Sequence, residues 1–252
     1  MEHEQLAKEL LAAERHRTPY PLFSQRFGSS FSWNDARRIA VAVDELRRSD
    51  GDQVAGYKLG WTSAAMRTAL GIERPNWESL WISQRIEDVL NLEELIVAKV
   101  EPELVCRLGA DLDPAASLAE VAGSCTQWTV GLEIVAPRFG SFVFEWLDNT
   151  ADNSSAARFV IAGFANCDDP SEIAVTMSDR TETRTGRGSA AMGSPVDAVY
   201  WLVKALAEEG RQLHAGQIVF TGGLTAPFDL TPSLVVSATA PGVGATCSFR
   251  CD

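Results

Sequence analysis

The sequence predicts an α+β protein, with a helical segment in residues 1–52 and a β-rich body in residues 53–252. In the first segment, apolar residues recur every three or four positions, which is the period of an amphipathic helix. In the second, short apolar runs alternate with clusters of glycine, proline and aspartate, which is typical of strands joined by turns. We expect the body to form one compact unit, because its length allows a sizeable core.

Two helices are expected in the N-terminal segment. The first covers residues 4–16, where three leucines share one face. The prolines of residues 18–21 end it, because proline cannot continue a helix. The second helix begins at a capping box formed by Ser32 and Asp35 and runs to about Arg48.

The elements of the body follow from the same kinds of pattern. Ser194 and Pro195 begin the clearest helix, which Gly210 ends. Residues 71–81 and the polar stretch 148–155 are expected to be loops. Shorter helices are expected in residues 63–70 and 115–122. The expected strands are residues 54–61, 96–108, 126–135, 159–162, 173–177, 217–221, 234–240 and 245–251.

Composition and charge exclude several classes of protein. The net charge of -12 argues against non-specific binding to nucleic acid or to an anionic membrane, because the field of the protein repels both. No signal-peptide pattern and no membrane-spanning apolar run is present, so a cytoplasmic location is expected. The five cysteines lack metal-site spacing, and none of the three histidines lies beside a nucleophile signature. A Ser-His-Asp or Cys-His enzyme is therefore not expected.

The expected strand of residues 100–108 carries two acids that share one face, Glu101 and Glu103. Their Cα atoms would lie about 7 Å apart. Two fixed carboxylates repel each other unless a cation lies between them, which suggests a hard divalent metal. The alternative is a solvated edge strand, in which Pro102 and the acids prevent pairing with another chain. This stretch alone favours the alternative.

Two further charged residues lie in apolar strands. Glu133 is either exposed at an edge or a ligand whose burial is offset by a partner. With Glu101 and Glu103 it would give three carboxylates, a donor set that suits Mg²⁺ or Mn²⁺. Lys58 either points outward from a half-exposed strand or is desolvated, in which case its pKa would be lowered and suited to acid-base chemistry.

Two short loops could also contribute to a site. The backbone N–H groups of residues 222–225 could approach an anionic ligand, although an ordinary turn explains this Gly-Gly stretch as well. Residues 152–155 could likewise be only a turn and a helix cap.

Six motifs occur in a recognisable order. They are Gly-Tyr-Lys-Leu-Gly-Trp-Thr-Ser (56–63), Glu-Pro-Glu (101–103), Leu-Glu-Ile-Val (132–135), Ala-Asp-Asn-Ser-Ser (151–155), Gly-Arg-Gly-Ser…Gly-Ser-Pro-Val-Asp-Ala (186–198) and Gly-Gln-Ile-Val-Phe-Thr-Gly-Gly-Leu-Thr (216–225). Together they resemble the 2-keto-4-pentenoate hydratase family, which includes related 4-oxalocrotonate decarboxylases and belongs to the fumarylacetoacetate hydrolase superfamily. The resemblance covers almost the whole chain.

The resemblance implies a mixed β-sandwich roll with an N-terminal helical segment, in a homo-oligomer. It implies that Glu101, Glu103 and Glu133 hold Mg²⁺ or Mn²⁺, which would bind the carboxylate and 2-oxo oxygen of a small 2-oxoacid. Lys58 matches the family's active-site lysine, and Ser155 matches a serine that positions substrate or water.

The same resemblance assigns the substrate carboxylate to the loop of Gly223, Leu224 and Thr225. One stretch departs from the family pattern, because Pro-Asn-Trp-Glu (75–78) replaces Pro-Asp-Phe-Gly. Asn76 cannot transfer a proton as an aspartate could. Either Glu78 substitutes from a shifted position, or this step is absent or different. Trp77 would reshape the distal part of the pocket.

The expected function is a metal-dependent lyase that adds water to 2-hydroxypenta-2,4-dienoate or a similar 2-oxo-4-enoic acid. The product would be a 4-hydroxy-2-oxoacid. The first alternative is decarboxylation of a 2-oxo-dioic acid of the 4-oxalocrotonate type at the same metal. A second is a repurposed or non-catalytic subunit in a complex with a related enzyme. Hydrolysis of an acylpyruvate is less favoured, because only His16 could supply the histidine that this reaction uses.

Overall fold

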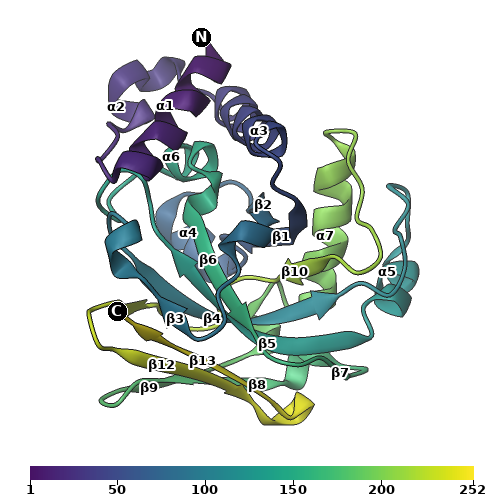
Figure 1. Cartoon of the computed structure of the whole chain (residues 1–252). Helices are drawn as coiled ribbons and strands as arrows, with labels where there is room; N and C mark the ends of the chain where they lie inside the picture. The colour runs from purple at the N-terminus through teal and green to yellow at the C-terminus, as the bar shows by residue number, and fades with distance from the viewer.

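The computed structural model describes residues 1–252 and shows a helical layer at one end of two β-sheets (Figure 1). The helices are α1 (His3–His16), α2 (Phe23–Phe27), α3 (Trp33–Ser49), α4 (Ala64–Leu70), α5 (Leu118–Ser124), α6 (Trp146–Ala151) and α7 (Pro195–Ala207). The strands are β1 (Val54–Gly60), β2 (Asn76–Trp81), β3 (Val89–Leu90), β4 (Lys99–Arg107), β5 (Gln127–Val135), β6 (Ala156–Ile161), β7 (Ala165–Asn166), β8 (Ala174–Ser178), β9 (Thr183–Arg187), β10 (Ile218–Phe220), β11 (Phe228–Asp229), β12 (Val235–Ala240) and β13 (Ala245–Cys251). The predicted α+β class is confirmed. No helix has both the length and the apolar character needed to cross a membrane.

The larger sheet has the strand order β2-β1-β10-β4-β5-β6, with β11 beside β4 and β7 beside β5. The smaller sheet has the order β3-β13-β12-β8-β9 and lies against the larger one at the end away from α1–α3 (Figure 1). Leu104 and Leu132 of the larger sheet and Val236 and Phe249 of the smaller one belong to the same buried core. Because side chains alternate along a strand, the neighbours of Leu104 and Leu132 point to the opposite face of the larger sheet.

The N-terminal helices pack on the body through a separate apolar cluster. Leu10 of α1 and Ile39 of α3 meet Phe139 and Ala151 of the body there. Both predicted helices of this segment are confirmed; α1 begins one residue earlier than predicted, and α3 ends one residue later. The predicted capping box is also present, since the Ser32 and Asp35 side chains each accept a hydrogen bond from the other residue's backbone N–H.

Two predicted loops are wrong. Residues 76–81 form the buried strand β2, and residues 146–151 form the helix α6. In both stretches the polar residues that suggested a loop are buried and paired with distant groups: Glu78 binds Arg37, and Asp148 accepts a hydrogen bond from Ser24 Oγ. A sequence pattern contains information only about residues that are near in the chain, so a polar residue that pairs with a distant group is predicted to be exposed. The short helix α2 and the polar edge strand β9 were also missed.

Glu14 of α1 joins the helical layer to the body, and its charge should make this contact sensitive to acid. Its carboxylate binds Arg138 of the body at 2.7 Å and Arg47 of α3 at 2.9 Å. Burial opposes this charge, but the two guanidinium groups outweigh it and lower the pKa of Glu14 from 4.5 to about 2. The ionised form therefore stabilises the fold above pH 4.5, and this contribution is lost as the pH falls toward 2.

We expect Glu14→Gln to lower the free energy of unfolding by about 2–3 kcal/mol at pH 6 and by much less at pH 2.5. Urea unfolding at the two pH values measures this difference. An equal loss at both would show that the charge of Glu14 does not stabilise the fold.

Candidate functional site

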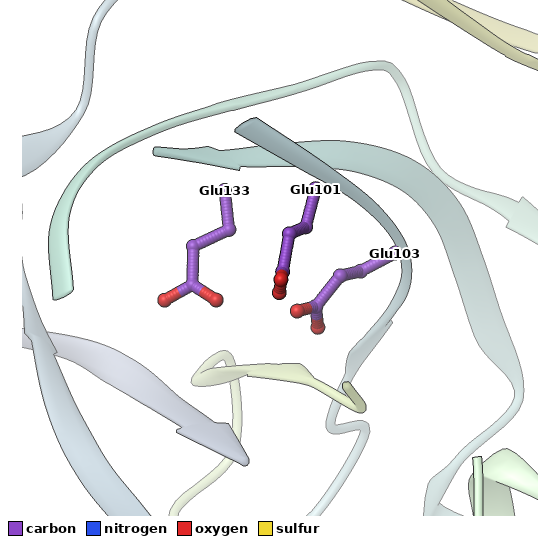
Figure 2. A group of neighbouring side chains, drawn as sticks. All are labelled: Glu101, Glu103 and Glu133. Carbon is purple, nitrogen blue, oxygen red and sulfur yellow. The ribbon is translucent and has the colours of Figure 1, made fainter. Parts of the chain in front are cut away.

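Three glutamates on two neighbouring strands converge at one point. Strands β4 and β5 are antiparallel, and Glu101 lies directly opposite Glu133 in their register. Glu103 lies two residues from Glu101 on the same face of β4. The three carboxylates point toward a common space (Figure 2), and one oxygen of each lies within 4.8 Å of the others. Since β4 lies between β10 and β5, the edge-strand alternative is wrong.

Several oxygens of these carboxylates lack the hydrogen bonds that buried carboxylates normally accept. Glu103 and Glu133 are fully buried. Gly222 N donates to Glu103 Oε2 at 2.7 Å, but Glu103 Oε1 and both oxygens of Glu133 accept no hydrogen bond. Burial and the neighbouring carboxylates raise the pKa of Glu101 to about 7 and raise that of Glu103 well above its usual range. Free oxygens of three close carboxylates are a suitable donor set for a hard divalent cation, so these residues fit Mg²⁺ or Mn²⁺.

Lys58 of β1 points into this cluster, not outward. It is buried, and its Nζ lies 3.3 Å from Glu133 Oε2. Burial opposes the charge of Lys58, but the carboxylates of Glu133, Glu103 and Glu101 outweigh it and raise the pKa of the ammonium group. The expected lowering of the Lys58 pKa is therefore wrong for the protein without a metal, because the sequence did not show how close the three acids lie.

The hydroxyl beside Lys58 belongs to Ser154 and not to Ser155. Lys58 Nζ donates to Ser154 O at 3.2 Å and to Ser154 Oγ at 3.1 Å. Ser155 Oγ instead accepts from Asn149 Nδ2 at 3.0 Å and donates to Asp152 at 3.1 Å. The sequence placed this motif at the site, but it missed Ser154 because the backbone turn that decides which serine faces Lys58 has no local signal.

A cavity of about 420 Å³ lies beside Glu101 and Lys58. Lys58 and Glu101 lie at its wall, as do all three residues of the predicted carboxylate loop, Gly223, Leu224 and Thr225. The remaining lining residues are Leu59, Gly60, Trp61, Thr62, Ser63, Met66, Ala190, Ala226 and Pro227. The structure thus brings together the predicted metal ligands, the lysine and the loop.

Gly222 allows the loop to approach the segment that follows β1. Its φ of +110° lies in the region that favours glycine, and a Cβ at this position would lie 1.9 Å from Thr62 Oγ1. Thr62, Trp61, Ser63 and Met66 were not singled out from the sequence. The motif that contains Lys58 extends through the first three of these residues and was the signal that could have found them.

Asn76, Trp77 and Glu78 do not line the cavity. Asn76 Oδ1 accepts from Ser154 Oγ at 3.1 Å, so it orients the residue that touches Lys58. Trp77 lies in the core, where the Arg37 guanidinium stacks 4.2 Å from its ring centroid. The Glu78 carboxylate binds Arg37 in a buried ion pair.

Burial raises the pKa of Glu78 to about 8, against the opposing effect of Arg37. A pKa near neutrality would suit proton transfer, but the partner of this carboxylate is a guanidinium outside the cavity. The geometry therefore gives no support to Glu78 as a catalytic acid or to Trp77 as a wall of the pocket.

Comparison with known proteins identifies close relatives of two kinds. A comparison with protein-family models finds no match. The chain is 33% identical over 196 residues to 2-keto-4-pentenoate hydratase 2 of Dechloromonas aromatica, covering 73% of this chain and 75% of that protein. It is 29% identical over 217 residues to a 4-oxalocrotonate decarboxylase of Pseudomonas putida, covering 83% and 82% of the two chains.

Solved structures also include a 4-oxalocrotonate decarboxylase that is similar to this chain. The 4-oxalocrotonate decarboxylase from Pseudomonas putida G7, complexed with magnesium and adipate, has a TM-score of 0.93 at 26% identity, covering 99% of this chain and 97% of that one. Fumarylpyruvate hydrolase from Pseudomonas aeruginosa, in complex with Mn²⁺ and pyruvate, has a TM-score of 0.61 at 17% identity, covering 77% and 88%. The latter likeness shows the shared fold.

Proposed function

This chain belongs to the family of the 2-keto-4-pentenoate hydratases and 4-oxalocrotonate decarboxylases, and on that premise we propose that it is a divalent-metal-dependent hydratase. Its substrate would be 2-hydroxypenta-2,4-dienoate or a similar 2-oxo-4-enoic acid, and its product a 4-hydroxy-2-oxoacid. The observation that carries this proposal is the cluster of Glu101, Glu103 and Glu133, of which Glu101 lines a cavity that Lys58 also lines.

Each part of the site has a role in this reaction. A dication held by the three glutamates would supply Lewis-acid stabilisation of negative charge on the substrate's carboxylate and 2-oxo oxygens. Lys58 would move protons near the 2-oxo end, and Ser154 holds its ammonium in place. The loop of Gly223, Leu224 and Thr225 lies beside Glu101, where a substrate carboxylate would approach.

The reaction needs one internal proton shift and one addition of water. The enol hydroxyl loses its proton and C5 gains one, which converts the dienol to a conjugated 2-oxo-3-enoate. Water then adds its hydroxyl at C4 and a proton at C3. Asn76 cannot supply either proton, and Lys58 and Glu101 are the two ionisable side chains in the cavity lining. We therefore assign the proton shift to Lys58.

The lining also favours hydration over decarboxylation of a dioic acid. A second carboxylate at the far end of the substrate would need a cation, and the far wall consists of uncharged residues. Arg67 lies behind this wall, but its Nη1 donates to the backbone carbonyls of Trp61 and Thr62 at 2.5 and 2.9 Å. Decarboxylation remains the second candidate, because the structure of a decarboxylase matches almost the whole chain.

Other properties are proposed on the same basis. The metal is Mg²⁺ or Mn²⁺, which the oxygen-only donor set supports. Residues 53–252 form the catalytic body, in a mixed β-sandwich roll, and residues 1–52 are a helical segment attached to it. Family resemblance supports a homo-oligomer and leaves open a complex with a related enzyme, and sedimentation would measure the assembly.

The direct test uses Mg²⁺-loaded protein with 2-hydroxypenta-2,4-dienoate and, separately, with 4-oxalocrotonate. We expect rapid loss of the dienol's ultraviolet absorbance and no release of CO₂ from 4-oxalocrotonate, because the site lacks a partner for a second carboxylate. A dienol that decays no faster than in buffer would rule out hydration. CO₂ release without dienol loss would instead support the decarboxylase, and inactivity toward both would support a non-catalytic subunit.

A further inference from the structure

Three consecutive residues after α6 adopt the left-handed backbone conformation. Asn153, Ser154 and Ser155 have φ values of 55°, 47° and 58°. None of them is glycine, and all three are buried. Each such residue costs on the order of 1–3 kcal/mol, so a run of three persists only where surrounding contacts hold it. Strain of this kind concentrates at functional sites, which raises the question of what holds this turn.

The turn decides where the Lys58 ammonium points. An ammonium group has three donors. The Ser154 backbone oxygen and Oγ lie 3.2 and 3.1 Å from Lys58 Nζ, and Glu133 Oε2 lies at 3.3 Å. Ser154 therefore supplies two of the three nearby acceptors. A shift of Ser154 would release the ammonium while leaving the glutamates on their strands.

Arg138, in the loop after β5, binds the residue from which the turn begins. Its Nη1 donates to Asp152 O and to Asp152 Oδ1, both at 2.9 Å. Its backbone N donates to Asp152 Oδ2 at 3.2 Å, and Ser155 Oγ donates to the same oxygen at 3.1 Å. Arg138 and Asp152 are buried, so water does not compete for these bonds. The carboxylate of Asp152 thus ties Arg138 to the far end of the turn.

The other edge of the Arg138 guanidinium is held by the N-terminal helix. Its Nε and Nη2 donate to Glu14 Oε2 at 3.0 and 2.7 Å. A guanidinium is a rigid planar fork, so fixing one edge with Glu14 aims the opposite edge at Asp152. A lysine could not make both contacts, because its donors radiate from a single nitrogen.

We propose that Arg138, oriented by Glu14 of the N-terminal helix, is a positioning residue that holds the strained turn of Asn153–Ser155 and thereby fixes Ser154 against Lys58. The helical segment then contributes to the active site without touching substrate. The expected effect on turnover rests on the proposed function, whereas the expected effect on Lys58 itself does not.

The test compares Arg138→Lys with the unaltered protein, both loaded with Mg²⁺. The primary readout is the rate at which acetic anhydride modifies Lys58, followed by mass spectrometry. We expect this rate to rise several-fold, because Ser154 no longer holds the ammonium. We also expect kcat to fall roughly 10- to 100-fold, the usual effect of a misplaced catalytic group, with KM and Mg²⁺ affinity nearly unchanged.

Two further variants test whether the effect passes through Glu14 and whether it is specific to Arg138. Glu14→Gln keeps Arg138. It should raise the rate of Lys58 modification and lower kcat, each by a smaller factor than Arg138→Lys does. Arg158→Lys is the matched control, because Arg158 follows the turn on β6 and pairs with Glu94 at 2.9 Å without contacting the turn. It should leave Lys58 modification and turnover unchanged.

Modification of Lys58 at the unaltered rate in Arg138→Lys would overturn the proposal. In Arg138→Lys, amide exchange could also rise along β4 and β5 as much as in the turn of Asn153–Ser155, with loss of Mg²⁺ affinity. That result would also overturn the proposal, because it would show that the whole site has become less stable. If the unaltered protein turns over neither substrate, the proposed function fails, but the Lys58 modification rates still decide the positioning role.

Discussion

Glu103→Gln should strongly weaken metal binding and abolish turnover while stabilising the metal-free protein. Glutamine keeps the shape of the side chain and an oxygen that can accept from Gly222 N, as Glu103 Oε2 does at 2.7 Å. It removes one negative charge and one ligand. Loss of residues that merely support metal ligands costs 10- to 100-fold in affinity, so we expect a loss of at least roughly 100-fold in Mg²⁺ affinity.

The opposite effect on stability follows from the same geometry. Without a metal, Glu103 is buried near Glu101 and Glu133, and repulsion opposes folding. Removing one charge should raise the free energy of unfolding of the metal-free protein by on the order of 1 kcal/mol. Calorimetric titration with Mg²⁺ and urea unfolding in chelator measure the two effects. The control is Glu172→Gln, because Glu172 is exposed and pairs only with Arg187 at the surface. Mg²⁺ affinity within twofold of the unaltered value would remove Glu103 from the metal site.

Lys58→Met should have nearly as large an effect on turnover and a different effect on the metal. Methionine fills similar space but cannot move a proton, so kcat should fall by about 10²- to 10⁴-fold. Mg²⁺ affinity should stay equal or increase, because a positive charge 3.3 Å from Glu133 is removed. Loss of turnover with retained metal binding separates this variant from Glu103→Gln.

Metal dependence of stability gives a second readout for Lys58. In the metal-free variant the three glutamates lose the cation that faces them, which should cost roughly 3–5 kcal/mol, as removal of one partner of a buried ion pair usually does. Mg²⁺ should therefore raise the melting temperature of Lys58→Met more than that of the unaltered protein. Lys8→Met is a suitable control, since Lys8 is exposed on α1. Turnover close to that of the unaltered protein would contradict the role of Lys58.

Local patterns predicted most of the elements and the placement of the three glutamates on their strands, whereas the interpretation of these glutamates as metal ligands rests on the family resemblance. Alternation along β4 places Glu101 and Glu103 on one face, and an acid in the apolar strand β5 marks Glu133. The capping box of α3 and the Ser-Pro start of α7 are equally local signals. The loops expected in residues 71–81 and 148–155 are exceptions, because the polar residues there pair with distant groups.

The predictions that differ from the structure needed distant partners. Glu78 looked available for catalysis because its partner, Arg37, lies 41 positions earlier on α3. The contact of Ser154 with Lys58 was not anticipated, because it depends on a left-handed turn whose partner Arg138 is distant from Lys58 in the sequence. The pKa of Lys58 was expected to fall with burial, but three acids from two other strands raise it.

The most direct test of the central claim is the position of a bound metal. Crystals of the protein grown with Mn²⁺ should show one strong anomalous-scattering peak between the carboxylates of Glu101, Glu103 and Glu133 (Figure 2). Mn²⁺ scatters anomalously and takes the same oxygen ligands as Mg²⁺. A peak at that place would establish the metal centre on which the proposed hydration depends. Full Mn²⁺ occupancy elsewhere, or no peak between these three carboxylates at saturating Mn²⁺, would contradict it.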